Sequence, residues 1–346
     1  MTQAFIALSV SFLVTLLTTP LMIFIGKKFG LVDKPDARKI HKEPIPRVGG
    51  VAIFLGFFIG CLVLGRFGEQ MLALMAASVI IMLLGFIDDA KNISPLAKLA
   101  GQAVAAFLVV RSGLVVEFLT NPITGGEISL GWLSVPLTMV WLIGMSNAVN
   151  LIDGMDGEAA GVSAISAGMI AIICVLQGPQ SVAAVAGLLA AACIAFLFFN
   201  FNPARIFMGD SGSLFIGFAL ATISIMGFSK SATFISVVIP IIILGTPIMD
   251  TFFAILRRLF SHKPVFEADK GHMHHRLLQR GLSQKRAVLV IYAVTFLLGI
   301  AAILMSLLTT AQALVILIIV ILLASFGADK LGVLKPSSQK VQPEKE

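Results

Sequence analysis

Long apolar blocks constrain the fold of this chain more than any other feature of its sequence. Leu72–Phe86, Ser181–Phe199 and Ala311–Phe326 contain no charged residue. With their flanks, these blocks are long enough to cross a hydrocarbon layer of about 30 Å. Because backbone polar groups inside lipid must be satisfied within their own segment, such blocks are helices. The chain is 58% hydrophobic and 12% charged, which is too little charge for a soluble domain of 346 residues. The sequence therefore predicts an all-α integral membrane protein.

The apolar pattern predicts a polytopic bundle of about eleven transmembrane helices. We expect them at residues 3–25, 48–65, 69–87, 96–111, 132–149, 160–176, 181–199, 213–228, 234–256, 287–308 and 311–328. Placing the connecting loops on alternate sides divides them into two sets. Of the 25 Lys and Arg, only Arg66, Arg111 and Lys230 fall in the set that faces the same side as the N-terminus. Since basic loops face the cytoplasm, the N-terminus is expected outside and the C-terminus in the cytoplasm.

The same pattern predicts one transmembrane domain over residues 1–328, followed by a polar tail at 329–346 that we expect to be disordered. Turn pairs at Asn121-Pro122 and Gly125-Gly126 predict a small external β-hairpin. The net charge of +7 follows from the basic cytoplasmic loops. Nucleic acid is therefore not expected as a partner, whereas nucleotide phosphates and anionic headgroups are.

Five acidic residues carry the strongest functional signal. Asp88, Asp89, Asp153, Asp156 and Asp210 lie where loops of the basic set meet helix ends, so their carboxylates can converge. Two ionised carboxylates about 5 Å apart repel by roughly 3 kcal/mol at an effective dielectric near 20. A cluster must therefore take up protons or bind a hard divalent cation. Mg²⁺ suits the pattern because it joins a few carboxylates to substrate phosphates. The alternative is that each Asp only caps a helix.

A histidine-rich motif, Gly-His-Met-His-His-Arg, forms a second candidate element. It contains His272, His274, His275 and Arg276. A bidentate Arg beside imidazole donors favours a phosphate or pyrophosphate clamp. Zinc is the competing ligand, but no Cys pair supports it and Arg276 would disfavour a cation. A simple solvated loop stays open as the third explanation.

The first basic loop is a third candidate element. It carries Lys39 and ends in Arg47-Val-Gly-Gly at the start of a predicted helix. Glycines allow the backbone to approach a ligand closely, and a helix N-terminus favours an anion.

Asp250 lies inside the predicted span 234–256, where an ionisable group is a functional candidate. Pairing with Arg257, or helix capping, explains Asp250 equally well.

Taken together, these motifs resemble the polyprenyl-phosphate N-acetylhexosamine-1-phosphate transferases. The matching stretches run in order through the chain, at residues 85–89, 147–157, 200–213 and 272–276. The resemblance implies a multi-pass enzyme of the bacterial plasma membrane. Such an enzyme transfers N-acetylglucosamine-1-phosphate from UDP-GlcNAc to undecaprenyl phosphate, releases UMP and starts a teichoic acid or O-antigen type polymer. The muramoyl-pentapeptide transferases form a sister branch, so UDP-GalNAc or UDP-MurNAc-pentapeptide stays open as donor, and so does homodimer formation.

The resemblance also implies roles for individual residues. Asp210 matches the magnesium ligand of the family, with Asn150 as its companion, and Mn²⁺ could replace Mg²⁺. Asp88 and Asp89 match the catalytic acidic pair that is credited with acceptor activation or metal contact. Positions expected to bind the substrates are Asn147, Asp153, Asp156, Asn202, Arg47, Lys39, His272, His274, His275 and Arg276.

The chemistry of the acceptor limits the role of Asp88. A phosphate monoester has a second pKa near 6 and is largely dianionic at neutral pH. A general base would gain little, so we predict that Asp88 orients the acceptor or the metal. A two-step route, with an Asp attacking the β-phosphate first, stays open. The competing class is an ion-coupled transporter, but carriers place their charges near the membrane midplane, not at helix ends.

Overall fold

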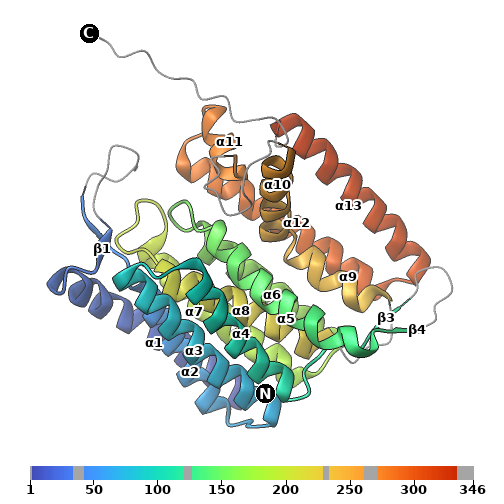
Figure 1. Cartoon of the computed structure of the whole chain (residues 1–346), viewed down its shortest axis with the longest axis horizontal. Helices are drawn as coiled ribbons and strands as arrows, with labels where there is room; N and C mark the ends of the chain where they lie inside the picture. Colours follow the sequence, from blue (N-terminus) through green and yellow to red (C-terminus); the bar gives the residue numbers. More distant parts are fainter. Residues whose placement is uncertain (1, 34–42, 121–126, 229–233, 261–270, 333–346) are drawn as a thin grey trace.

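The computed structural model describes residues 2–33, 43–120, 127–228, 234–260 and 271–332, and it shows a helical bundle (Figure 1). The helices are α1 (Thr2–Lys28), α2 (Gly49–Leu64), α3 (Glu69–Lys91), α4 (Pro95–Arg111), α5 (Ser134–Leu151), α6 (Glu158–Leu176), α7 (Gln180–Asn200), α8 (Gly209–Phe228), α9 (Phe234–Ile243), α10 (Gly245–Phe260), α11 (Met273–Gln279), α12 (Gln284–Leu307) and α13 (Thr310–Leu331). Within the described ranges, eight of them are long and apolar enough to cross a membrane. The predicted all-α membrane fold is confirmed at this level.

Each predicted span corresponds to one helix, with one exception. The span expected at 234–256 is not continuous, because α9 ends at Ile243 and α10 begins at Gly245. Pro247 has no N–H to donate to the carbonyl of Ile243, which breaks the helical hydrogen-bond pattern there. Helices α2 and α4 have only 16 and 17 residues. The number of eleven spans and their orientation therefore stay predictions.

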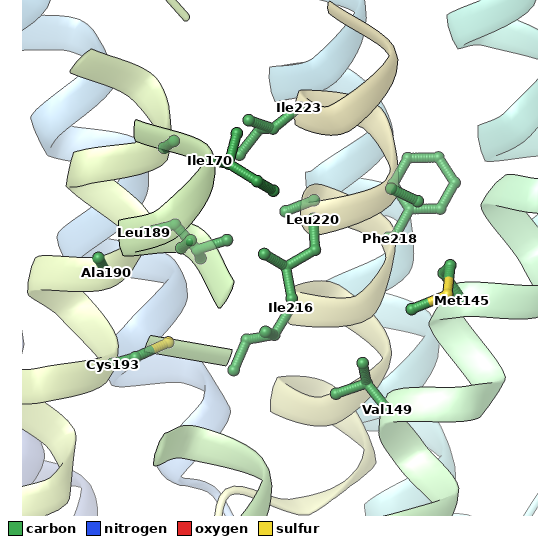
Figure 2. Close-up of a cluster of buried hydrophobic side chains, with 14 of the residues drawn as sticks. Met145, Val149, Ile170, Leu189, Ala190, Cys193, Ile216, Phe218, Leu220 and Ile223 are labelled. Carbon is green, nitrogen blue, oxygen red and sulfur yellow. The ribbon is translucent and has the colours of Figure 1, made fainter. Parts of the chain in front are cut away.

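Helix α8 forms the centre of the bundle. It packs against α2, α3, α5, α6 and α7, and nearly all of its residues are buried, whereas α13 is almost wholly exposed. Figure 2 shows Ile216, Leu220 and Ile223 of α8 among side chains of α6 and α7, with Phe218 on the side of α5. Lipid tails are as apolar as these side chains, so close packing, and not exclusion from water, holds α8 in place.

The start of α2 crosses the start of α8 at very short range. A Cβ added at Gly50 would lie 2.1 Å from the backbone nitrogen of Gly212. The amides of Gly49 and Gly50 donate to the carbonyls of Phe207 and Met208, at 2.9 and 2.8 Å. These first-turn amides are therefore used inside the protein. The expectation that this helix N-terminus binds an anion was wrong, and its glycines instead allow two backbones to meet.

Two short antiparallel hairpins lie at opposite ends of the bundle (Figure 1). Strands β3 (Phe118–Thr120) and β4 (Glu127–Ser129) pair antiparallel, which confirms the strands of the predicted hairpin, and they share their end with the N-terminus. The predicted turn pairs lie outside the described residues, and the external location stays a prediction. Strands β1 (Val32–Asp33) and β2 (Ile45–Pro46), which we did not predict, lie at the other end together with α11. The described loops of the basic set thus gather at one end of the molecule.

Candidate active site

Asp89, near the end of α3, caps the start of α8. Its carboxylate accepts hydrogen bonds from the backbone amides of Asp210 and Ser211, at 2.8 and 3.0 Å. Gly209 has a φ of +70°, and a Cβ there would lie 2.4 Å from Oδ2 of Asp89. Free amides at a helix start favour an anion, so a carboxylate from another helix satisfies them. Asp89 therefore brings the α8 carboxylate, Asp210, to the end of α3.

Two cations link the clustered carboxylates. Nζ of Lys98, on α4, lies 2.7 Å from a carboxylate oxygen of Asp88 and 2.7 Å from one of Asp210. Arg47 lies 2.7 Å from Asp210 and 3.2 Å from Asp89. Burial lowers the pKa of Arg47, but Asp89 and Asp210 outweigh this effect and raise it above its ordinary value. Three carboxylates and two cations thus form one network.

A large cavity lies beside this network at the β1–β2 end of the bundle. Its volume is about 1370 Å³, and it spans from α1 to the histidine segment, residues 272–276. Residues that line it include the predicted site residues Arg47, Asn150, Asp153, Asp156, Asn202, Asp210 and His275. Residues from five separate parts of the chain therefore share one space.

Asp153 is the least satisfied carboxylate of the cavity. In the described part of the chain no group donates a hydrogen bond to it, and burial, followed by the negative charge of Glu158, raises its pKa to about 8. Asn150 donates its amide to Oγ of Ser213 at 2.8 Å, and its amide oxygen receives no donor from the described residues. Asp153 and Asn150, together with Asp210, thus offer oxygen ligands to a hard cation.

These donors fit a magnesium ion that binds together with a phosphate ligand. Among the residues that the structure describes, no three acidic or histidine side chains are placed to hold an ion by themselves. Mg²⁺ keeps several waters and uses one or two carboxylates plus substrate phosphates, so it does not need such a cage. The carboxylate of Asp153 receives no hydrogen bond from the described residues, so a bound cation would stabilise its charged form.

Asp156 lines the cavity, whereas Asn147 does not. Asn147 exchanges amide hydrogen bonds with Gln102, at 2.9 and 3.3 Å, and is absent from the cavity lining. Asp156 accepts hydrogen bonds from Asn202 Nδ2 at 2.9 Å and from the amide of Ala204 at 3.0 Å. Asp156 and Asn202 therefore fix the loop before α8 and also line the cavity.

The residues of the histidine segment also differ in whether they line the cavity. His272 Nδ1 lies 2.7 Å from Asp250, and His274 Nδ1 lies 3.3 Å from Glu158. Burial lowers the pKa of His274, but its interactions with Glu158 and the negative charges of Asp250 and Asp153 together outweigh burial, so this pKa lies above its ordinary value. Only His275 of the histidine segment is part of the cavity lining. Arg276 is buried, and Lys39 lies outside the described residues.

Two residues of these networks, Lys98 and Glu158, were missing from the sequence-based site, and a third, Asp250, was expected to have a different partner. Apart from Arg111 at its last position, Lys98 is the one charged side chain of the predicted span 96–111, and a lysine inside a span was a usable signal. Glu158 begins α6, where an acidic residue is ordinary. Asp250 was a candidate with Arg257 as its expected partner, but its carboxylate binds His272 and the amide of Met273.

Comparison with known proteins adds an independent observation. Residues 71–228, which include all five acidic candidates, match Glycosyl transferase family 4. A protein of Bacillus subtilis (strain 168), described as a "Probable undecaprenyl-phosphate N-acetylglucosaminyl 1-phosphate transferase", is 41% identical over 344 residues, which cover 99% of this chain and 95% of the relative. The chain belongs to glycosyl transferase family 4.

Other members of family 4 align over most of the chain as well. A "Decaprenyl-phosphate N-acetylglucosaminephosphotransferase" of Mycobacterium tuberculosis (strain H37Rv) is 35% identical over 316 residues, or 81% of this chain and 77% of the relative. A "Phospho-N-acetylmuramoyl-pentapeptide-transferase" of Halalkalibacterium halodurans is 35% identical over 321 residues, or 86% and 96%. The resemblance inferred from the motifs is thereby confirmed, including its sister branch.

Proposed function

We propose that the protein transfers N-acetylglucosamine-1-phosphate from UDP-GlcNAc to undecaprenyl phosphate and releases UMP. The product, undecaprenyl-diphosphate-GlcNAc, would begin a cell-surface polymer of the teichoic acid or O-antigen type. The observation that carries this proposal is the shared cavity in which Asp210, Asp153 and Asn150 meet Arg47 and His275. The Bacillus subtilis relative, with its near full-length alignment, supports UDP-GlcNAc as donor.

The size and charge of the cavity support a large phosphorylated substrate. A volume of about 1370 Å³ exceeds the roughly 300–1,000 Å³ of ordinary ligand pockets. That is room for a nucleotide-sugar and the headgroup of an acceptor. Arg47 can bind phosphate oxygens bidentately, and its contacts to Asp89 and Asp210 orient its guanidinium.

Magnesium is part of this proposal, with manganese as a substitute. Asp210, Asp153 and the amide oxygen of Asn150 would hold the ion. When bound, it supplies neutralisation of charge on the diphosphate, which is the main requirement of phosphoryl transfer. Asp153 must lose its proton to serve as a ligand, and its exposure to the cavity gives that proton a path to water.

The position of Asp88 supports an orienting role. Its carboxylate is held by Lys98 at 2.7 Å and by the amide of Ile93 at 2.8 Å, and it does not line the cavity. An acceptor phosphate that is already dianionic needs no proton removed. Asp88 therefore fixes Lys98, and Lys98 in turn fixes Asp210. Asp89 acts likewise, through the start of α8.

Release of UMP tests the proposal directly. Purified protein, UDP-GlcNAc and undecaprenyl phosphate should release UMP with Mg²⁺ and should stop when EDTA is added. Parallel reactions with UDP-GalNAc and UDP-MurNAc-pentapeptide decide the donor. Exchange of labelled UMP into UDP-GlcNAc without acceptor would indicate the two-step route. No UMP from any donor would contradict the proposal, and ion-coupled transport, which the relatives named above do not support, would need testing.

A further inference from the structure

Two buried carboxylates outside the cavity lie against the histidine segment, residues 272–276. Asp250, from α10, is 3% exposed and Glu158, from α6, is 2% exposed. A charge this deeply buried is costly unless it is paired and hydrogen-bonded. Neither carboxylate lines the cavity, so a direct contact with substrate does not account for them.

Each carboxylate is paired with a different histidine of the segment. Asp250 binds Nδ1 of His272 with one oxygen and the amide of Met273 with the other, both at 2.7 Å. Glu158 lies 3.3 Å from Nδ1 of His274. The two imidazole rings are stacked, with centroids 5.8 Å apart and planes at 10°. The beginning of α11 is therefore fixed at two points by two different helices.

His274 also packs against the acidic loop at residues 152–157. A Cβ added at Gly154 would lie 2.4 Å from Cε1 of the His274 ring, so only glycine leaves room for it. Tyr292 of α12 donates its hydroxyl to the carbonyl of Gly157 at 2.5 Å. The histidine segment and α12 thus both contact the loop that carries Asp153.

His275, the next residue along the chain, is less buried than the two anchored histidines. His275 is half-buried and lines the cavity, whereas His272 and His274 are buried and do not. Successive residues of a helix point about 100° apart, so anchoring His274 determines where His275 points. The three histidines therefore divide into two anchors and one residue that can reach a ligand.

We propose that Asp250 and Glu158 are positioning residues that hold the histidine segment through His272 and His274, so that His275 and the acidic loop meet the nucleotide-sugar in one fixed geometry. This inference rests on the proposed function, because it names the nucleotide-sugar as the ligand of His275. It assigns no substrate contact to His272 or His274.

A charge-removal and rescue series tests this inference. Glu158→Leu leaves His274 buried without its partner, so the KM for UDP-GlcNAc should rise at least about tenfold, with kcat and the KM for undecaprenyl phosphate little changed. The double variant Glu158→Leu/His274→Phe replaces the ion pair by apolar packing and keeps a ring on Gly154. It should restore the KM for the donor to within about threefold of wild type. Asp250→Asn should resemble Glu158→Leu.

Two controls separate an anchor from a substrate contact. Glu69→Leu, at an exposed position of α3, should leave both KM values unchanged. His275→Phe should raise the KM for the donor, and no change at Glu158 should rescue it. An unchanged donor KM in Glu158→Leu, or a double variant that folds but is not rescued, would overturn the inference.

Hydrogen exchange separates this inference from the proposed function. Without any substrate, the amides of α11 should exchange faster in Glu158→Leu and Asp250→Asn and return to wild-type rates in the double variant. If the wild-type protein releases no UMP but the exchange follows this pattern, the proposed function fails and the anchoring stands. If exchange in α11 does not respond to either single variant, the anchoring fails, whatever the activity.

Discussion

At the scale of single residues, one side-chain type serves three purposes in this site, and its partners decide which. Asp89 has both oxygens occupied by backbone amides and Arg47. Asp210 is held by Arg47 and Lys98 but also lines the cavity. Asp153 lines the cavity without a hydrogen-bond donor in the described part of the protein. The capping explanation thus applies to Asp89, while Asp210 and Asp153 face the cavity.

Removing the cap of α8 should destabilise the protein. Asp89→Ala leaves the first amides of α8 and the guanidinium of Arg47 without their acceptor. We expect a loss of about 1–2 kcal/mol in unfolding free energy, visible as a lower Tm in detergent. Asp329→Ala, at an exposed position of α13, is the control and should leave the Tm unchanged. Equal Tm values for both variants would contradict the capping role.

The raised pKa of Asp153 predicts a pH dependence of stability. Its pKa of about 8 in the fold lies above the value near 4 of an unfolded chain. The neutral form is therefore favoured by folding, and its stabilising contribution, complete below about pH 4, is lost as the pH rises through about 8. The Tm of metal-free protein should fall over this range, and less so in Asp153→Asn. Mg²⁺ should raise the Tm of wild type most near pH 8. Identical pH profiles would contradict the assignment.

At the scale of helices, the sequence predicted positions well and contacts poorly. Apolar runs fix where helices lie, because lipid leaves the backbone no other structure. The break between α9 and α10 was missed because residues 234–256 contain a single charged residue, Asp250, so the apolar pattern does not show where one helix ends and the next begins. The acidic cluster was predictable because its residues share helix ends. Lys98 left a usable signal, a lysine inside a predicted span, that the prediction did not use. Glu158 left none, since it meets a histidine 116 positions away, and no local pattern encodes that distance.

The crossing of α2 and α8 should tolerate no side chain. Gly50→Ala would place a Cβ 2.1 Å from the backbone of Gly212, and neither backbone can give way easily. We expect destabilisation of about 1–3 kcal/mol, measured by thermal unfolding, and lower activity because Asp210 begins the same helix. Gly168→Ala is the matched control, since a Cβ there meets nothing within 4 Å. A Gly50→Ala variant as stable as Gly168→Ala would show that the helices do not cross in this way.

At the scale of the whole molecule, the two ends of the bundle differ in charge and structure. The cavity, the β1–β2 hairpin and the described basic loops lie at one end, and the β3–β4 hairpin lies at the other. The excess of Lys and Arg at the cavity end predicts that this end is cytoplasmic.

Cysteine labelling checks this orientation. Cys61, Cys174 and Cys193 are buried and free, so their background reaction should be low. Ser129→Cys, at the end of β4, should react with a membrane-impermeant maleimide on intact cells. Lys91→Cys, at the exposed end of α3 near the cavity, should react only after permeabilisation. The reverse pattern would show that the cavity faces outward.

Counting bound Mn²⁺ by electron paramagnetic resonance tests the central claim most directly, because that claim is a divalent cation held by carboxylates together with a diphosphate. In the presence of UDP, wild-type protein should bind about one Mn²⁺ per chain, in competition with Mg²⁺. Asp210→Ala should abolish this site, Asp153→Asn should weaken it about tenfold or more, and the exposed Asp329→Ala should leave it intact. Unchanged Mn²⁺ binding in Asp210→Ala would contradict the account.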